Sequence, residues 1–371
     1  MVKVKKQSSV PEGRLLSLDF FRGFTMLLLV GEATELFHYL SDPSLKGTFI
    51  YAIGNQLHHY PWHGLHFWDL VQPFFMFIVG VAIPFSVAKR EKQGLTSREN
   101  LRHAIGRSLM LLFLGWALYC IMPGKIVPRF QNVLAQLSVT YLIAFLIRNK
   151  SFRIQLIFSL CLLVVTELIY RFFLVEGFNH PFVANQNFGT WLDLQYGGAD
   201  LKWHWVSFNA IPTTAHTIWG VLAGTLLLRK DKTPMQKFKI LAMAGIIGIV
   251  AGYALNPFTP IIKRIATSSF VIVSGGYALL VLAISYWLID IKKLRDWVLF
   301  FAVVGMNPLF IYLFDHIGGA RFIHHILLPF THVLFGWMGI LTENILTSTA
   351  VWALLWYITW WMYKRKIFIK I

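Results

Sequence analysis

Long apolar runs, separated by short polar segments, recur along nearly the whole chain and constrain its fold more than any other feature. A run of about 20 apolar residues is long enough to cross the hydrocarbon core of a bilayer as a helix. Charged residues make up only 14% of the 371 residues, a share too small for a soluble protein of this length. The sequence therefore predicts an all-α polytopic membrane protein with one transmembrane domain, residues 1–371, and excludes a soluble two-domain enzyme.

The apolar runs predict about ten membrane-spanning helices. They lie at 15–37, 67–88, 104–121, 131–147, 152–174, 208–228, 239–256, 268–289, 297–314 and 346–363. A further apolar stretch, 323–341, is interrupted by Pro329, Gly336 and Gly339, so we expect a re-entrant or interfacial segment there. The alternative, an eleventh span, would move the basic C-terminal end to the other side of the membrane.

The formal net charge of +17 raises the question of a nucleic-acid partner. The basic residues lie in short loops between apolar runs, which is the pattern that orients membrane proteins, so no such partner is expected. With a cytoplasmic N-terminus, most basic residues fall on the cytoplasmic side, including Lys3, Lys5, Lys6, Arg14, Lys364, Arg365, Lys366 and Lys370. Both termini are then cytoplasmic, and two long segments, 38–66 and 171–207, lie on the outer side.

Four histidines crowd the point where the first of these outer segments meets the second span: His58, His59, His63 and His66. A metal site would need helical spacing through three of them, but Pro61 interrupts a helix and no cysteine joins, so no metal is expected. Histidines of an interfacial aromatic belt are a second interpretation. The third, which we favour, is a general base or an acyl-accepting nucleophile at the membrane boundary.

Two carboxylates lie close to these histidines along the predicted spans. Asp69 has His66 and Gln72 as its helical neighbours, and it is either a helix N-terminal carboxylate or the group that fixes a histidine tautomer. Glu32 lies in the outer half of the first span, where a charge costs roughly 2.5–3.5 kcal/mol on insertion scales and usually marks a site or pathway.

Further polar groups lie at the ends or breaks of spans. Asp19 and Arg22 are three residues apart at the inner end of the first span, where they form either a self-neutralising anchor or a site for an anionic ligand. Ser268 and Ser269 begin the eighth predicted span, and Asn307 precedes Pro308 inside the ninth. A structural kink with helix-end serines is the simpler interpretation of these three residues.

Several stretches together resemble the heparan-α-glucosaminide N-acetyltransferase family and its bacterial members. They are "RLLSLDFFRGFTMLLLV", "WHGLHFWDLVQPFFMFIVGVAIPFS", "RFQNVLAQLSVTYLIAFLI", "IKRIATSSFVI", "GMNPLFIYL" and "WWMYKRKIFIKI". The likeness runs from about Arg14 to the end of the chain. It implies transfer of an acetyl group from cytoplasmic acetyl-CoA to the amine of a glucosamine-type sugar on the outer side. The bacterial form, which lacks the lumenal domain of the lysosomal enzyme, implies an inner-membrane location.

The same resemblance implies the role of one residue, and the clustering of titratable groups at one membrane depth motivates the others. The family's active histidine lies three residues before a Trp that precedes x-Gly, which places it at His59, with Trp62 and Gly64 as anchors. We expect His59, Asp69 and Glu32 to be catalytic, the last standing near the position of a family Asn that this chain lacks. The acceptor is expected to contact Trp62, His63 and His66. Coenzyme A is expected to contact Asp19, Arg22, Ser268, Ser269 and Asn307.

Two other functions compete with acetyl transfer to an amine. Carboxylates within spans and a broken helix are also features of secondary transporters, here for an amino sugar, although no internal repeat is evident. An O-acyltransferase of an envelope polysaccharide is the other alternative. Membrane lipid is an expected partner in every case, and a homodimer is a further expectation.

Overall fold

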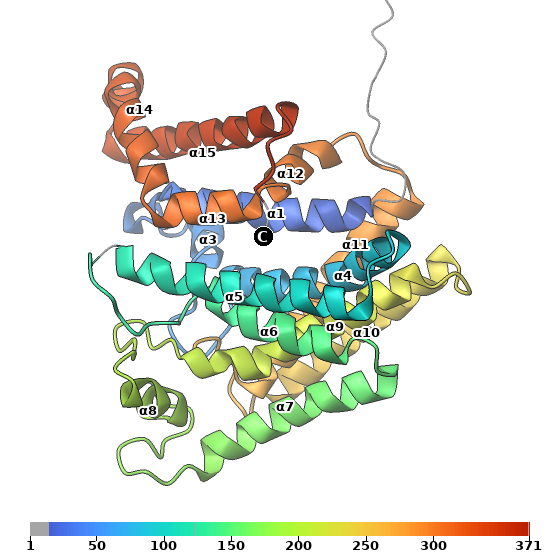
Figure 1. The fold of residues 1–371 in the computed structure, drawn as a ribbon. Helices are drawn as coiled ribbons and strands as arrows, with labels where there is room; N and C mark the ends of the chain where they lie inside the picture. Colours follow the sequence, from blue (N-terminus) through green and yellow to red (C-terminus); the bar gives the residue numbers. More distant parts are fainter. Residues whose placement is uncertain (1–14, 122, 370) are drawn as a thin grey trace, which may run out of the picture.

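The protein is seen here in a computed structural model, which describes residues 15–121, 123–369 and 371. Within these ranges its regular structure is helical, and the long helices lie side by side in one bundle (Figure 1). Five basic residues assigned to the cytoplasmic side fall outside the described residues: Lys3, Lys5, Lys6, Arg14 and Lys370. The prediction of an all-α membrane protein is confirmed.

Each predicted span coincides with a helix. The long helices are α1 (Leu16–Ala33), α4 (Val71–Lys92), α5 (Ser97–Ile121), α6 (Val133–Ile147), α7 (Phe152–Phe172), α9 (Ala210–Leu228), α10 (Pro234–Leu255), α11 (Ser268–Ser285) and α15 (Ile340–Lys364). A 3-10 turn, Phe67–Leu70, precedes α4, and a π-helical turn, Tyr286–Ile291, follows α11. The ninth predicted span is a pair of shorter helices, α12 (Val298–Gly305) and α13 (Pro308–His316), which meet at an angle of 63°.

The predicted number of about ten spans is not confirmed. Among the described residues, seven helices are long and apolar enough to cross a membrane, or eight if α12 and α13 count as one broken span. Two of the expected spans fall short for physical reasons. The 18-residue α1 carries the charged side chains of Asp19, Arg22 and Glu32, and α6 has only 15 residues.

The stretch expected to be re-entrant or interfacial is a continuous helix, α14 (Gly319–Phe335), despite Pro329 within it. A 3-10 turn, Gly336–Met338, follows, and Gly339 at φ 90° redirects the chain into α15. Gly339 adopts a left-handed backbone that favours glycine. In Figure 1, α14 runs across the direction of α15 instead of lying alongside it as an eleventh span would.

Helices that follow one another through short connections run in alternate directions, so the loops gather at two ends of the bundle. One end holds the segment 57–66, here called the histidine loop, and we call this end the histidine face. It also holds the short helices α2 (Leu36–Leu40), α3 (Phe49–Gln56) and α8 (Phe188–Gln195). The opposite face collects the basic connections of the sequence, such as Lys89, Arg90, Lys92, Arg148, Lys150, Arg229 and Lys230.

Contacts of glycine residues allow α4 and α9 to pack closely. Residues just before these two helices belong to the site described below. A Cβ atom on Gly220 would lie 2.2 Å from the Phe77 carbonyl oxygen, and one on Gly80 would lie 2.0 Å from that of Thr217. No side chain fits at such distances, so the two backbones touch directly. The small-residue spacing of Gly220 and Gly224 therefore lets α9 approach α4 closely.

Candidate active site

The histidine loop connects α3 to the turn that begins α4, and two distant segments hold it. The backbone N–H of Gly64 donates to the carbonyl of Ile261 at 2.9 Å, and the Trp62 indole donates to the carbonyl of Phe182 at 2.8 Å. The loop contains no helix, as expected from Pro61. It therefore takes its shape from tertiary contacts.

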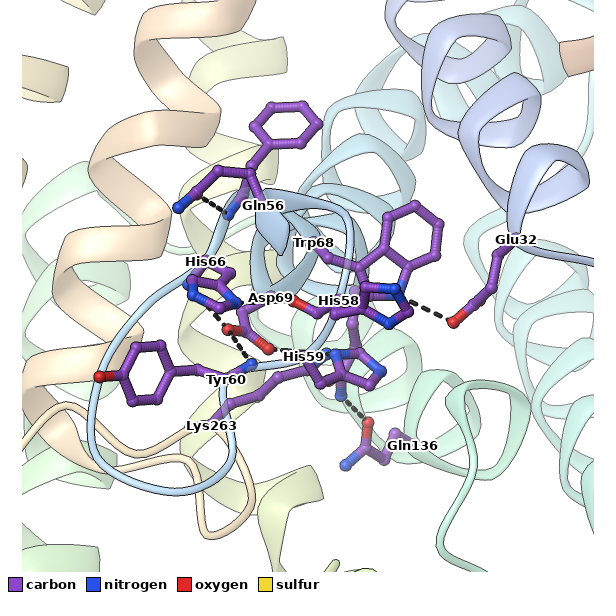
Figure 2. Close-up of polar contacts among 12 residues, drawn as sticks. Glu32, Gln56, His58, His59, Tyr60, His66, Trp68, Asp69, Gln136 and Lys263 are labelled. Atoms are coloured by element: carbon purple, nitrogen blue, oxygen red, sulfur yellow. Dashed lines mark hydrogen bonds and ion pairs between the residues drawn. The ribbon is translucent and has the colours of Figure 1, made fainter. Parts of the chain in front are cut away.

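Asp69 anchors the loop from below. Its side chain is 1% exposed, and its Oδ2 accepts hydrogen bonds from the backbone N–H groups of Tyr60 at 3.1 Å and His66 at 2.9 Å. Its Oδ1 lies 3.1 Å from Nδ1 of His59. One carboxylate thus caps the start of the helix and also faces a histidine ring, so the two interpretations of Asp69 describe the same side chain (Figure 2).

Lys263 completes this cluster from a distant part of the chain. It lies in the connection between α10 and α11, and its Nζ is 2.9 Å from Nδ1 of His59 and 3.6 Å from Oδ1 of Asp69. Its side chain is 6% exposed, and the ammonium lies 5.2 Å from the centre of the Trp205 ring. A buried cation thus touches both members of the His59–Asp69 pair, and we call these three residues the His–Asp–Lys cluster.

Burial sets the charge states within this cluster. Burial and the nearby Lys263 cation together lower the pKa of His59 to about 4, although Asp69 opposes both effects. Burial also lowers the pKa of Lys263 to about 8, against the opposing pull of Asp69. At neutral pH the His59 ring is therefore neutral, and Lys263 is mainly cationic.

Nδ1 of His59 lies close to two groups that favour different tautomers of the ring. Asp69 can only accept a hydrogen bond, so it favours a proton on Nδ1, whereas the Lys263 ammonium donates and needs a lone pair there. The first arrangement leaves a lone pair on Nε2, and the second puts a proton on Nε2. Nε2 hydrogen-bonds to none of the described residues, and the side chain is 30% exposed. Nε2 is therefore the nitrogen that can meet a substrate.

Glu32 reaches the cluster through an aromatic side chain. The Trp68 indole N–H donates to Oε1 of Glu32 at 2.9 Å, and the Trp68 ring centre is 6.4 Å from that of His59 (Figure 2). Of the three residues expected to be catalytic, the structure thus brings His59 and Asp69 into direct contact. Glu32 lies one residue further away.

The residues expected to bind the acceptor point in different directions. His63 hydrogen-bonds to Oδ1 of Asn256 at 3.0 Å, away from His59. Nδ1 of His66 lies 3.0 Å from the His58 carbonyl oxygen, and its ring packs edge-on against Tyr60. Trp62 turns toward the segment that carries Phe182. Only His66 contacts the cluster, through its backbone N–H to Asp69.

The five residues expected to contact coenzyme A do not meet in one place. Ser268 and Ser269 begin α11 at the histidine face, where the Ser268 hydroxyl donates to Glu167 at 3.2 Å. Arg22 and Asp19 pair at 3.9 Å near the start of α1, at the opposite face. The amide of Asn307 binds the C-terminal backbone, donating to the Ile367 carbonyl at 2.9 Å and accepting from the Ile369 N–H at 2.9 Å.

The structure also bears on the metal interpretation. Within the described ranges, no group of three or more His, Cys, Asp or Glu side chains is placed to hold a metal ion. His59, His63 and His66, which have helix-like spacing in the sequence, each bond to a different partner. The histidine loop thus separates the three rings instead of gathering them.

Lys263 is the one residue of the cluster that was not expected in the site from the sequence. It lies 204 positions from His59, so no local pattern connects the two residues. A signal does exist, because Lys263 and Arg264 stand together on the side of the protein that is otherwise poor in basic residues. Two adjacent basic residues on the side of a membrane protein that otherwise has few of them indicate an ion pair with a buried acidic residue.

Comparisons with known proteins agree with the resemblance read from the sequence. No family model matches the chain. Heparan-alpha-glucosaminide N-acetyltransferase of Mus musculus is 25% identical over 425 aligned residues, and that of Homo sapiens is 26% identical over 426. Each alignment covers 96% of this chain and 60% of the relative, so the chain spans about three fifths of the length of these relatives. The chain is thus a distant relative of the heparan-alpha-glucosaminide N-acetyltransferases.

Proposed function

We propose that this protein transfers the acetyl group of acetyl-CoA to the amine of a glucosamine-type sugar. The names of its relatives support an acyltransferase, since both are N-acetyltransferases of a glucosaminide. The observation that carries the proposal is the His–Asp–Lys cluster, in which Nδ1 of a neutral histidine is held from two sides and Nε2 is left open. This is the arrangement that a general base or nucleophile requires.

The cluster supplies what acyl transfer from a thioester needs. With Nδ1–H donated to Asp69, Nε2 of His59 takes the proton from the amine as the amine nitrogen attacks the acetyl carbonyl carbon. A carbon–nitrogen bond forms, the carbon–sulfur bond breaks, and the leaving thiolate takes up the proton that His59 holds.

A two-step route uses the same nitrogen. Nε2 attacks the carbonyl carbon first, the thiolate leaves, and the imidazole carries the acetyl group until the amine displaces it. Both routes need a lone pair on Nε2, and therefore both need the tautomer that Asp69 favours. Rapid mixing with acetyl-CoA in the absence of acceptor separates them, because only the two-step route releases one thiol per protein.

The donor and the acceptor are proposed to arrive from opposite sides. Arg22 and Asp19 stand near the start of α1, at the face that collects the basic loops, and basic loops mark the cytoplasmic side. Glu32 lies thirteen residues beyond Asp19 on the same helix, a rise of about 20 Å. We propose that Arg22 attracts the phosphates of coenzyme A at the cytoplasmic face of a bacterial inner membrane. The side chains of Ser268, Ser269 and Asn307 hydrogen-bond to other groups of the protein, so we do not assign them to coenzyme A.

The direct experiment uses purified protein in nanodiscs with acetyl-CoA and glucosamine. We expect free thiol and N-acetylglucosamine to appear in equal amounts. In controls without the amine, or with an amine that is already acetylated, thiol release should not exceed hydrolysis of the thioester. Any single-turnover burst of thiol is subtracted first. An ester product, cleaved by hydroxylamine, would favour the O-acyltransferase alternative. An intact thioester after long incubation would overturn the proposal.

One observation favours the transporter alternative, namely the 63° bend between α12 and α13 at Met306 and Asn307. Broken helices line substrate paths in many transporters. Here the amide of Asn307 closes the break with the C-terminal backbone, which gives the break a structural role. Uptake of labelled glucosamine into proteoliposomes without acetyl-CoA would decide for transport.

The pH dependence of the reaction tests the role of Lys263. As the pH rises through about 8, the Lys263 ammonium loses its proton and ceases to donate to Nδ1, so more of His59 carries its lone pair on Nε2. In Lys263→Met this step is absent. The pKa of His59 also rises in that variant, because the lysine cation that lowers it has gone.

We therefore expect the ratio of wild-type to Lys263→Met rates to increase on both sides of a minimum near neutral pH. It increases above about pH 8 through the lysine step, and below about pH 6 because the variant protonates His59 earlier. The titration of the sugar amine is common to both proteins and cancels in the ratio. Lys202→Met, an exposed lysine on the same face, is the control. A ratio that stays flat from pH 5 to pH 9 would contradict this role.

A further inference from the structure

A cavity of about 360 Å³ lies between α5, α6 and the start of α9. This volume lies within the range of small-molecule sites in proteins. Its lining includes Phe130, Tyr196, Ser207, Gln136, Leu112 and Val139. None of these residues takes part in the mechanism described above, so the cavity is a separate feature of the site.

The polarity of this lining changes with depth. Tyr196 and Ser207 lie in the loops of the histidine face, and Gln136 lies in the first turn of α6. Val139 lies six residues beyond Val133, the first residue of α6, which is about 9 Å further into the bundle. Leu112 faces it from the middle of α5. The cavity is therefore polar near the loops and apolar toward the middle of the membrane.

One group in the lining points to a ligand. The Gln136 side chain is 1% exposed, its Oε1 accepts a hydrogen bond from Gln72, and its Nε2 has no hydrogen-bond partner. A buried donor without a partner costs free energy and is rare in native proteins. An oxygen atom of a bound sugar would satisfy it.

Two short paths connect the cavity to the cluster. Gln72 lies three residues beyond Asp69, in the first turn of α4, and its side-chain amide donates to Oε1 of Gln136. Ser207 follows Trp205 by two residues, and the Trp205 ring centre is 6.5 Å from that of His59. The polar end of the cavity is therefore lined by residues that adjoin neighbours of the cluster, through Gln72 on one side and Trp205 on the other.

The apolar end of the cavity borders the lipid-facing surface of α5. Leu109 and Phe113, which flank Leu112 on that helix, are 61% and 55% exposed and would meet hydrocarbon chains. An apolar chain that lies along Leu112 is therefore next to side chains that would face the bilayer. A free sugar would leave the part between Leu112 and Val139 unfilled.

We infer that the acceptor is an amphiphile, an amino sugar joined to a hydrocarbon chain, and that the chain lies along Leu112 and Val139 while the sugar meets Gln136 near His59. This inference rests on the proposed acetyl transfer and specifies its substrate class. The polar end of the cavity matches the head group, and the apolar end matches the chain. A soluble amino sugar is then a poor substrate.

The test compares acceptors that share one head group. Rates are measured in nanodiscs with acetyl-CoA and with glucosamine, octyl glucosaminide or dodecyl glucosaminide, each with a free amine. We expect kcat/KM to rise at least about tenfold from glucosamine to the dodecyl compound, since chain methylenes leave water for an apolar groove. Val139→Trp fills the groove and should abolish this preference.

Matched variants separate the groove from partition into the bilayer. Leu109→Trp adds the same bulk on the exposed side of α5 and should keep the preference, and Leu112→Trp replaces Val139→Trp if the latter does not fold. Equal kcat/KM for all three acceptors, or a loss of preference in Leu109→Trp as well, would overturn the inference and leave the acetyltransferase intact. If no amine is acetylated, the proposed function fails. The groove can still be tested by labelling with a photoreactive dodecyl glucosaminide. The reagent should label the α6 segment in the wild type and label it less in Val139→Trp.

Discussion

Replacing His59 by alanine should lower kcat for acetyl transfer about 10²- to 10⁴-fold, the range that a general base contributes. The reason is the open Nε2 atom, which takes the amine proton or the acetyl group, and for which no other described side chain in the cluster substitutes. Lys263 is mainly protonated at neutral pH, and Asp69 is engaged by two backbone N–H groups. KM for the acceptor should change less than kcat, because the ring acts on the reacting atoms.

Two controls separate this effect from damage to the fold. His325→Ala removes an exposed histidine of α14, far from the cluster in the chain, and should retain full activity. Free imidazole should restore part of the rate in His59→Ala, because it can enter the space that the ring leaves. Full activity of His59→Ala at saturating acetyl-CoA would end the assignment.

Replacing Asp69 by asparagine is expected to cost a similar 10²- to 10⁴-fold in kcat while the protein stays folded. Oδ2 of Asp69 accepts from two backbone N–H groups, so the oxygen of the new amide must take that position. The NH₂ group then faces Nδ1 of His59 and donates to it. The proton of the ring is forced onto Nε2, and the base is lost although the shape of the side chain is retained.

Asp69→Ala is the informative comparison for this prediction. It leaves the partly buried N–H groups of Tyr60 and His66 without an acceptor, and an unpaired group costs up to about 1–3 kcal/mol when fully buried. We expect the melting temperature to fall in Asp69→Ala and to stay near that of the wild type in Asp69→Asn, while both variants are inactive. An active Asp69→Asn protein would show that the tautomer of His59 does not matter.

The part of the site that could be predicted from the sequence is the local part. Asp69 lies ten residues after His59 at the start of an apolar helix, and a carboxylate there both caps the helix and meets the loop before it. Pro61 rules out a helical metal site in the same stretch. These inferences depend on residues near one another in the chain, where spacing translates directly into distance.

The sequence could not show whether the residues expected to contact coenzyme A lie together. Asp19, Arg22, Ser268, Ser269 and Asn307 share a polar character within apolar surroundings, and the sequence offers no way to tell which ends of which helices lie together. The structure puts Arg22 and Ser268 at opposite faces. It also shows that the Asn307 amide is already used by the C-terminal backbone.

The sequence by itself determined that the chain is built of membrane helices and where those helices lie, and it drew attention to His59 and Asp69 near the entrance to one of them. Apolar runs and helix-end chemistry are local properties, so they can be read without a fold. Only the tertiary structure brought Lys263 and Trp205 to His59, since packing of helices far apart in the chain decides which loops meet. The buried cation that controls the histidine, and the cavity beside it, are products of that packing.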